Sequence, residues 1–216
     1  MSNIHESVFL APGSVVLRDV TIGAQSAVWF NTVIRGDEAP IRIGQGSNIQ
    51  DNTVVHGAPG FPVEIGDGVT VGHSAIIHGC KIGNNTLIGM GTIIMNGAVI
   101  GSNCVIGAGS LVTGGTVIPD GSVVVGRPAK VISSVSEKHL EMIRHNAEEY
   151  VSLMMEYRDG NFKNESLRGQ VPHRPSTLHA GPACESSPPA ENCPRGGSLT
   201  RRCSLNHLLT LTSHTF

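Results

Sequence analysis

The sequence predicts an all-β solenoid, a parallel β-helix of hexapeptide repeats, followed by one C-terminal α-helix and a disordered tail. Three observations support this fold class. Aliphatic residues recur at every sixth position through most of the stretch from Leu10 to Val124. Glycine, which tolerates the left-handed backbone of tight turns, contributes 27 of the 216 residues. Aromatic residues make up only 4%, as expected for a narrow interior that Ile and Val fill.

The six-residue period corresponds to one short strand and the turn that follows it. Each strand holds one inward aliphatic residue, and three strands close one triangular coil of about eighteen residues. Stacked coils then hydrogen-bond at about 4.8 Å, the normal spacing between strands. We therefore predict a β-helix over residues 8–132, and its resemblance to other hexapeptide β-helices implies left-handed winding, against the usual handedness of parallel crossovers. The inward positions are Leu10, Val16, Ile22, Val28, Ile34, Ile43, Ile49, Val55, Ile65, Val71, Ile77, Ile82, Ile88, Ile94, Ile100, Ile106, Val112, Ile118 and Val124.

The period slips at three places. Extra residues enter after Ile34, around "RGDEAP", and after Val55, around "HGAPGFP", whereas the spacing after Ile77 is one residue short. Irregularities in a solenoid usually mark loops on a binding face. All three lie next to a histidine or a charged cluster, so we expect function there.

The pattern changes after the last repeat. The segment "SVSEKHLEMIRHNAEEYVSLMMEYR" places apolar residues at three- and four-residue intervals, which predicts an amphipathic helix over 135–158 with Ser136 as its N-cap. Its apolar face must cover either the flank of the β-helix or a neighbouring subunit. Residues 160–216 are rich in Pro, Ser and Arg and lack periodicity, which predicts a disordered extension.

Charge and targeting signals narrow the partners and the compartment. The formal net charge is −2 and no basic patch with interleaved aromatics occurs, so we expect neither nucleic acid nor a membrane as partner. The start "MSNIHESVFLAPGS" lacks the features of a secretory signal, and no apolar run reaches membrane-spanning length. The five cysteines form no CxxC pair, so a disulfide scaffold is not expected. These features predict a cytoplasmic protein.

Three histidines in the repeats form the candidate metal site. His56 and His78 each follow an equivalent corner one coil apart, so their Cα atoms should stack roughly 5 Å apart. Both imidazoles then reach one metal ion, which accepts nitrogen at about 2.1 Å. His73 lies on the previous side of the triangle and points away from the pair. In a trimer this side can meet the His56 and His78 pair of a neighbouring subunit. Three histidine ligands on a tetrahedral zinc ion leave its fourth position for water.

Charged and amide residues lie beside these histidines. Arg35 and Asp37 stand at the first slip, and Gln50 and Asp51 lie in "NIQDN". An Arg–Asp pair can brace an interface, and a glutamine can orient a metal-bound water. The alternative is that Arg35 and Asp51 form only a structural ion pair. Cys80 is interpreted as a small inward residue rather than a ligand.

The motifs "RGD" at 35, "NIQDN" at 48, "VVHG" at 54 and "VGHSAIIHGC" at 71 resemble those of the γ-class carbonic anhydrase family. The resemblance covers about residues 8–158. It implies a homotrimer in which His56 and His78 of one subunit and His73 of the next bind Zn2+, with Fe2+ and Co2+ as alternatives. The implied reaction is the reversible hydration of CO2 to bicarbonate by a metal-bound hydroxide. In this family pattern Gln50 holds the metal-bound water, while Arg35, Asp37 and Asp51 organise the interface and the site.

One loop departs from the family pattern. The best-known active members carry an acidic loop after the first metal histidine, but here the segment is "GAPGFPVE", whose only acidic residue is Glu64. This departure predicts a slow or latent enzyme. Three alternatives remain open. They are an acyltransferase of the hexapeptide class with a single histidine as general base, a hydrolase of coenzyme A thioesters, and a non-catalytic trimeric scaffold that zinc stabilises.

Overall fold

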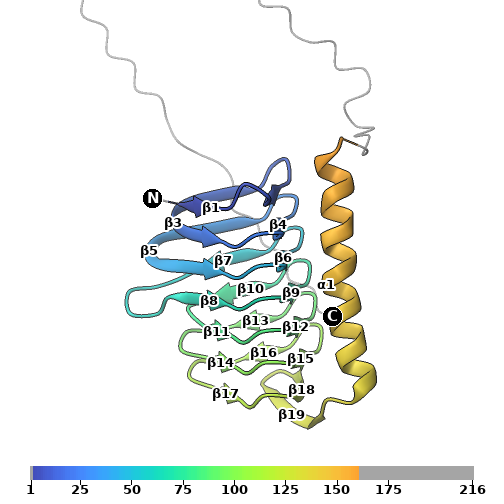
Figure 1. The fold of residues 1–216 in the computed structure, drawn as a ribbon. Helices are drawn as coiled ribbons and strands as arrows, with labels where there is room; N and C mark the ends of the chain where they lie inside the picture. The colour runs from blue at the N-terminus through green and yellow to red at the C-terminus, as the bar shows by residue number, and fades with distance from the viewer. Residues whose placement is uncertain (1, 161–216) are drawn as a thin grey trace, which may run out of the picture. The chain divides into compact units, whose positions relative to one another are not determined.

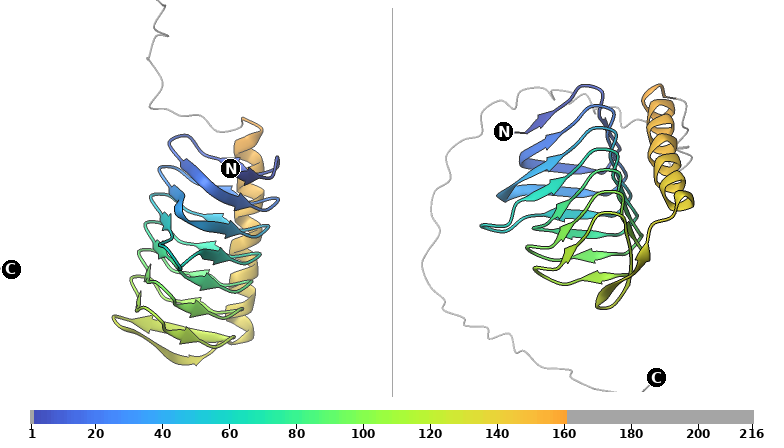
Figure 2. Two further views of the ribbon diagram at one scale, coloured as in Figure 1. Left: turned by 90° about the vertical axis from the view of Figure 1, so that its left-hand side faces the viewer. Right: turned by 60° about the horizontal axis from the view of Figure 1, so that its bottom comes forward.

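The computed structural model describes residues 2–160, so nearly all of the predicted extension over 160–216 lies outside the described residues. The described chain is a parallel β-solenoid with one C-terminal helix, which confirms the predicted fold class (Figure 1). Figure 2 shows the coils stacked along one axis, with the helix running back beside them toward the first coils. No helix among the described residues is long and apolar enough to cross a bilayer.

The coils have three faces. The histidine face comprises the first halves of β3 (Val15–Ile22) and β5 (Val33–Ile43), then β7 (Val54–His56), β10 (Ile76–His78), β13 (Ile93–Ile94) and β16 (Leu111–Val112). The charged face comprises β1 (Asn3–Ile4), the second halves of β3 and β5, then β8 (Val63–Ile65), β11 (Lys81–Ile82), β14 (Val99–Ile100) and β17 (Val117–Ile118). The helix face comprises β2 (Phe9–Leu10), β4 (Ala27–Val28), β6 (Asn48–Ile49), β9 (Thr70–Val71), β12 (Leu87–Ile88), β15 (Val105–Ile106), β18 (Ser122–Gly126) and β19 (Ala129–Ser134).

The interior is a stack of aliphatic side chains in register. Ile88, for example, pairs with Val71 of the coil before it and with Ile106 of the coil after it, and all three side chains are fully buried. Leu10 departs from the prediction, because it is 43% exposed. It belongs to the first coil, which has no further coil stacked on its outer side.

The first slip does not form the loop that the sequence predicts. The residues around "RGDEAP" lie within β5, a continuous strand of 11 residues whose two halves belong to different faces. A Cβ at Gly36 would lie 2.5 Å from the carbonyl oxygen of Asp19, so only glycine permits this close approach of β5 to β3. The second slip is a true loop, which closes through a bridge between Ala58 and Phe61.

The helix α1 (Glu137–Arg158) begins two residues after the predicted start and covers the helix face. Its first turn is capped by an unusual group, since the Ser136 backbone N–H donates to Nδ1 of His139 at 3.0 Å. The helix buries Ile143 and Met154. Of the two predicted surfaces for its apolar side, the structure therefore shows the flank of its own β-helix.

An aromatic cluster outside the bore attaches α1 to the solenoid. Trp29 is 3% exposed, and its ring makes edge contacts with Phe9, Tyr150 and Tyr157 at centroid distances of 5.4, 5.4 and 5.2 Å. Most aromatic residues of the described chain thus lie between the helix and the helix face, outside the aliphatic interior.

Trp29→Ala should lower the free energy of unfolding by about 3–5 kcal/mol, because it leaves a cavity between α1 and the coils. Urea denaturation followed by circular dichroism measures this loss. Trp29→Phe should cost less, since it keeps an aromatic ring and removes an indole N–H that lacks a hydrogen-bond partner in the described residues. An alanine variant as stable as the parent would contradict this account of helix docking.

Candidate metal site at the histidine face

His56 and His78 stack on adjacent coils of the histidine face. The strands β7 and β10 pair in parallel with Val55 opposite Ile77 and His56 opposite His78, which confirms the stacking that the repeat register predicts. The ring centroids lie 5.1 Å apart, and Nδ1 of His56 lies 3.1 Å from Nε2 of His78. Two ring nitrogens therefore face each other at a separation that a shared cation can bridge.

Asp37 holds the far nitrogen of His56. Its Oδ1 lies 3.1 Å from Nε2 of His56, and its Oδ2 pairs with the guanidinium of Arg35. Partial desolvation acts to raise the pKa of Asp37, but the hydrogen bonds from Arg35 and His56 outweigh it and lower that pKa overall. The ionised carboxylate only accepts hydrogen bonds, so Nε2 of His56 carries the proton. In the neutral imidazole the lone pair is then on Nδ1, which faces His78.

The far nitrogen of His78 has a partner of its own. Nδ1 of His78 contacts the side-chain oxygen Oδ1 of Asn96, which follows β13 on the next coil. When this oxygen accepts the Nδ1 proton, the lone pair of His78 is on Nε2 and faces His56. Two facing lone pairs repel each other unless a cation lies between them, so the donor set fits a metal ion that takes neutral imidazoles, such as Zn2+.

His73 does not join this pair within one chain. It follows β9 on the helix face, and its side chain is 41% exposed. Nδ1 of His73 lies 2.8 Å from Oδ2 of Asp51, and the backbone carbonyl of Asp51 accepts from the N–H of Ser74 at 2.9 Å. Among the described residues of one chain, no group of three or more His, Cys, Asp or Glu side chains could hold a metal ion. Asp51 thus orients His73 outward, with Nε2 available for another partner.

A groove of about 360 Å3 lies between α1 and the helix face, with His73 and Gln50 in its lining. Gln50 is buried, and its amide donates to Oδ1 of Asn48 at 3.1 Å. The amide of Asn48 in turn donates to the hydroxyl of Thr70 at 3.0 Å, so a chain of hydrogen bonds orients Gln50.

Tyr150 of α1 also lines this groove. Burial, and then the negative charges of Asp51 and Glu149, raise the pKa of the Tyr150 hydroxyl. The phenol therefore stays neutral near pH 7 and keeps a proton to donate.

The expected pair of Arg35 and Asp51 is not formed within one chain. Arg35 pairs with Asp37, whereas Asp51 binds His73 and accepts from the backbone N–H of Phe30 at 3.1 Å. The reason is their placement, because Arg35 lies on the histidine face and Asp51 follows β6 on the helix face. A pair between Arg35 of one subunit and Asp51 of another stays a prediction.

Two further groups are excluded from the site. Glu64 points from β8 on the charged face and pairs with Lys81 at 3.0 Å. Cys80 belongs to the hydrophobic core, and burial raises the pKa of its thiol to about 12. A thiol held neutral in this way does not supply the thiolate that metals bind, which agrees with its interpretation as a small inward residue.

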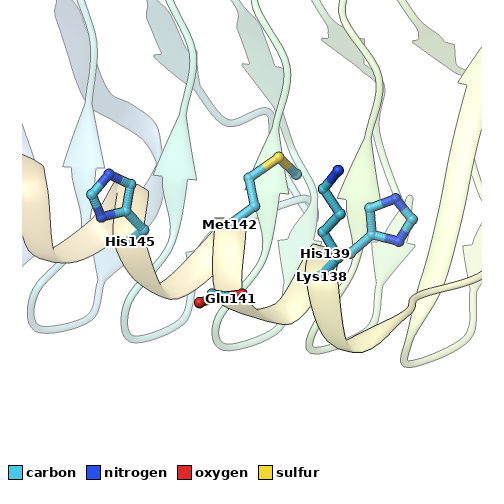
Figure 3. Close-up of a pocket in the computed structure, with 5 residues that line it drawn as sticks. All are labelled: Lys138, His139, Glu141, Met142 and His145. Carbon is cyan, nitrogen blue, oxygen red and sulfur yellow. The ribbon is translucent and has the colours of Figure 1, made fainter.

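A second groove, of about 670 Å3, lies along the first turns of α1 (Figure 3). Its two histidines have other partners, since His139 accepts from the backbone of Ser136 and His145 faces Glu149 at 3.9 Å. They project from the helix at separate places in Figure 3 and do not converge. The lining residues are Lys138, His139, Glu141, Met142 and His145.

Sequence reasoning missed three residues of the site. Asn48 stands in the "NIQDN" motif, two residues before Gln50, and a strand places both on one side. Asn96 was traceable through the repeat register, because Ile94 lies opposite Ile77 and Asn96 therefore stands one residue past the position opposite His78. Tyr150 carried no such signal, since its place over the groove depends on how α1 packs.

Comparisons with known proteins show the family of the chain. The family model for bacterial transferase hexapeptide (six repeats) matches residues 79–114. A Methanocaldococcus jannaschii protein named "Probable carbonic anhydrase" is 51% identical over 69% of this chain and 94% of its own. "Gamma carbonic anhydrase 2, mitochondrial" of Arabidopsis thaliana is 40% identical over 74% of this chain and 60% of its own. The solved structure of a hexapeptide transferase family protein from Anaplasma phagocytophilum is 40% identical, with a TM-score of 0.70, and covers 72% of this chain and 92% of that one. The chain belongs to the γ-class carbonic anhydrase family of hexapeptide-repeat proteins.

Proposed function

We propose that this protein is a zinc enzyme that hydrates CO2 reversibly to bicarbonate, at a site shared between neighbouring subunits of a homotrimer. The observation that carries the proposal is the pair His56 and His78, whose nitrogens face each other at 3.1 Å. Two nitrogens on a tetrahedral zinc, each at about 2.1 Å, lie roughly 3.4 Å apart. The pair thus needs only a small opening to hold the ion.

The third ligand in this proposal is His73 of the neighbouring subunit. Asp51 engages Nδ1 of His73 and so directs Nε2 outward. Such an arrangement is heterologous, and heterologous contacts that close into a ring give cyclic oligomers such as trimers. Arg35, Asp37 and Asp51 then organise the boundary between subunits.

The histidine face supports the trimer, because it is apolar and uncovered in one chain. A ladder of aliphatic side chains points outward along it, and Val15, Val54 and Ile76 are each 39% exposed. The equivalent ladder on the charged face carries ion-paired residues such as Glu64 and Lys81. The ladder comprises Val15, Val33, Val54, Ile76, Ile93 and Leu111. An apolar patch of this kind is typical of an interface between proteins.

The residues around the groove have distinct tasks in the proposed reaction. Zinc held by the three histidines would supply a water acidified enough to act as a nucleophile near neutral pH. Gln50, held by Asn48, would orient that water toward CO2. The neutral phenol of Tyr150 donates a hydrogen bond to the oxygen atoms of CO2 or bicarbonate.

Proton removal is the slow step in this proposal. Glu64 pairs with Lys81 on the charged face, so the loop between β7 and β8 supplies no carboxylate beside His56. Protons must then leave directly to buffer. This is the basis for expecting a slow or latent enzyme.

The expected result is about one zinc per chain and a hydration rate that rises with buffer concentration. Inductively coupled plasma mass spectrometry measures the metal, with Fe2+ and Co2+ tested as alternatives in anaerobic preparations. Stopped-flow hydration of CO2 with increasing imidazole then measures turnover. Buffer should raise kcat and leave kcat/KM unchanged, because it acts after bicarbonate has formed.

The same preparations test the alternatives. A metal-free protein that transfers an acyl group from coenzyme A would favour the acyltransferase. Hydrolysis of coenzyme A thioesters by the metal-loaded protein, without CO2 hydration, would favour the thioester hydrolase. A loaded trimer inactive in every assay would favour the zinc-stabilised scaffold.

The proposal names as partners two further copies of the chain and the small substrate, with neither nucleic acid nor membrane. It also includes a cytoplasmic location. The free thiols of the buried Cys80 and Cys104 support that location, because reduced cysteines are typical of reducing compartments.

A further inference from the structure

We propose that Asn96 is the positioning residue that makes His78 a metal ligand. Its Oδ1 accepts the proton on Nδ1 of His78 and so keeps the lone pair on Nε2, which faces His56. The inference rests on the proposed metal site and deepens it, because it assigns a role to a residue that contacts neither metal nor substrate.

The backbone around Asn96 is anchored to both neighbouring coils. The carbonyl of Asn96 accepts from the N–H of Gly115 at 3.0 Å, and the N–H of Gly97 donates to the carbonyl of Gly79 at 2.8 Å. Asn96 itself is half-buried. The turn that follows β13 therefore holds the side-chain amide of Asn96 in a fixed position beside His78.

Gly79 keeps the path between Asn96 and His78 open. Its φ is +56°, in the left-handed region that favours glycine. A Cβ at this position would lie 2.7 Å from Oδ1 of Asn96 and 2.8 Å from Cβ of Phe61. A larger residue directly after His78 would therefore displace the amide, and the absence of a side chain there permits the contact.

The orientation of the amide decides whether His78 can bind metal. If the NH2 group of Asn96 faced the ring, Nδ1 would be the acceptor and Nε2 would carry the proton. A protonated Nε2 has no lone pair for a metal. With Oδ1 toward the ring, each of the three histidines has a side-chain oxygen acceptor on the ring nitrogen that would not bind the metal. Asp37 provides this acceptor for His56, and Asp51 provides it for His73.

The test compares Asn96→Leu and Asn96→Asp with the parent protein. Leucine has nearly the same size but no acceptor, whereas aspartate has only acceptor oxygens and reproduces the proposed contact. Zinc affinity is measured by competition with a chromophoric chelator, a readout that does not depend on activity. We expect Asn96→Leu to bind zinc about 10–100-fold more weakly and Asn96→Asp to bind at least as tightly as the parent.

Asn84→Leu is the matched control. Oδ1 of Asn84 accepts from the backbone N–H of Asp67 at 2.9 Å, so this residue also joins adjacent coils, but at the turn between the charged face and the helix face. Its loss should lower thermal stability and leave the zinc affinity unchanged. Should Asn96→Leu fail to fold, Asn96→Ala carries the same expectation.

Three outcomes would count against the proposals, and they are distinguishable. Asn96→Leu with the affinity of the parent would overturn the role of Asn96 and leave the metal site intact. Equal weakening by leucine and aspartate would overturn it too, because it would assign the effect to packing or to the amide NH2. A parent protein that binds no metal would overturn the proposed function, and with it this inference.

Discussion

His73→Ala should abolish zinc binding, although this side chain lies on a different face of its own chain from His56 and His78. The expected zinc content falls from about one per chain toward zero, because two imidazoles alone leave half of the tetrahedral positions to water. Mass spectrometry of the metal and the native mass of the protein are measured together. The trimer should persist in the variant if the apolar ladder, rather than the metal, supplies most of the association energy.

Co-expression gives this prediction a decisive control. A His73→Ala subunit keeps both His56 and His78, and a His78→Ala subunit keeps His73. Neither homotrimer therefore contains a complete site. In trimers mixed at random from equal amounts, roughly a quarter of the boundaries combine the two intact halves. About that fraction of the parent zinc content should return. Full zinc content in the His73→Ala homotrimer would show that the site does not use a neighbouring subunit.

Val54→Lys should dissociate the trimer. Val54 is 39% exposed in one chain, and in the proposed assembly it lies within the buried ladder of the histidine face. An ammonium group buried there without a partner costs several kcal/mol at each of three boundaries. Light scattering coupled to size-exclusion chromatography should report a monomer, and zinc content should fall because His73 no longer reaches the neighbouring pair.

Val99→Lys is the matched control for this substitution. Val99 is the same residue type, is 37% exposed, and points outward on the charged face beside Lys81. Its replacement should leave the trimer and the zinc content unchanged. Val15→Lys, in the same ladder as Val54 but two coils from His56, separates loss of association from a direct effect on the metal. A Val54→Lys protein that remains trimeric would rule out the histidine face as the interface.

The repeat period predicted the stacking of the site because a solenoid converts sequence spacing into position. Each inward residue is followed by a similar turn, so residues that occupy equivalent places in successive coils must lie one strand spacing apart. His56 and His78 follow equivalent inward residues, and the structure places them opposite each other. This inference needed no knowledge of any contact between distant segments.

The same reasoning failed where the chain departs from the period. The extra residues around "RGDEAP" were expected to form a loop, but they extend β5 past the corner, since Gly36 lets the strand approach β3. Spacing alone reports how many residues are added and not whether they continue the hydrogen-bond ladder. The partner of Arg35 was missed for the same reason. The extension places Arg35 and Asp37 on one continuous strand, where alternate residues lie on the same side.

The amino-acid sequence by itself determined the coil, its three faces and the alignment of two histidines, because these follow from a period that every turn repeats. Only the tertiary structure decided which face α1 covers, how Tyr150 and Gln50 share a groove, and which group engages the far nitrogen of each histidine. Those features depend on side-chain packing and hydrogen bonds between segments that no common period relates. The histidine face remains uncovered in one chain for the same physical reason, since α1 has room to bury only one side of the prism.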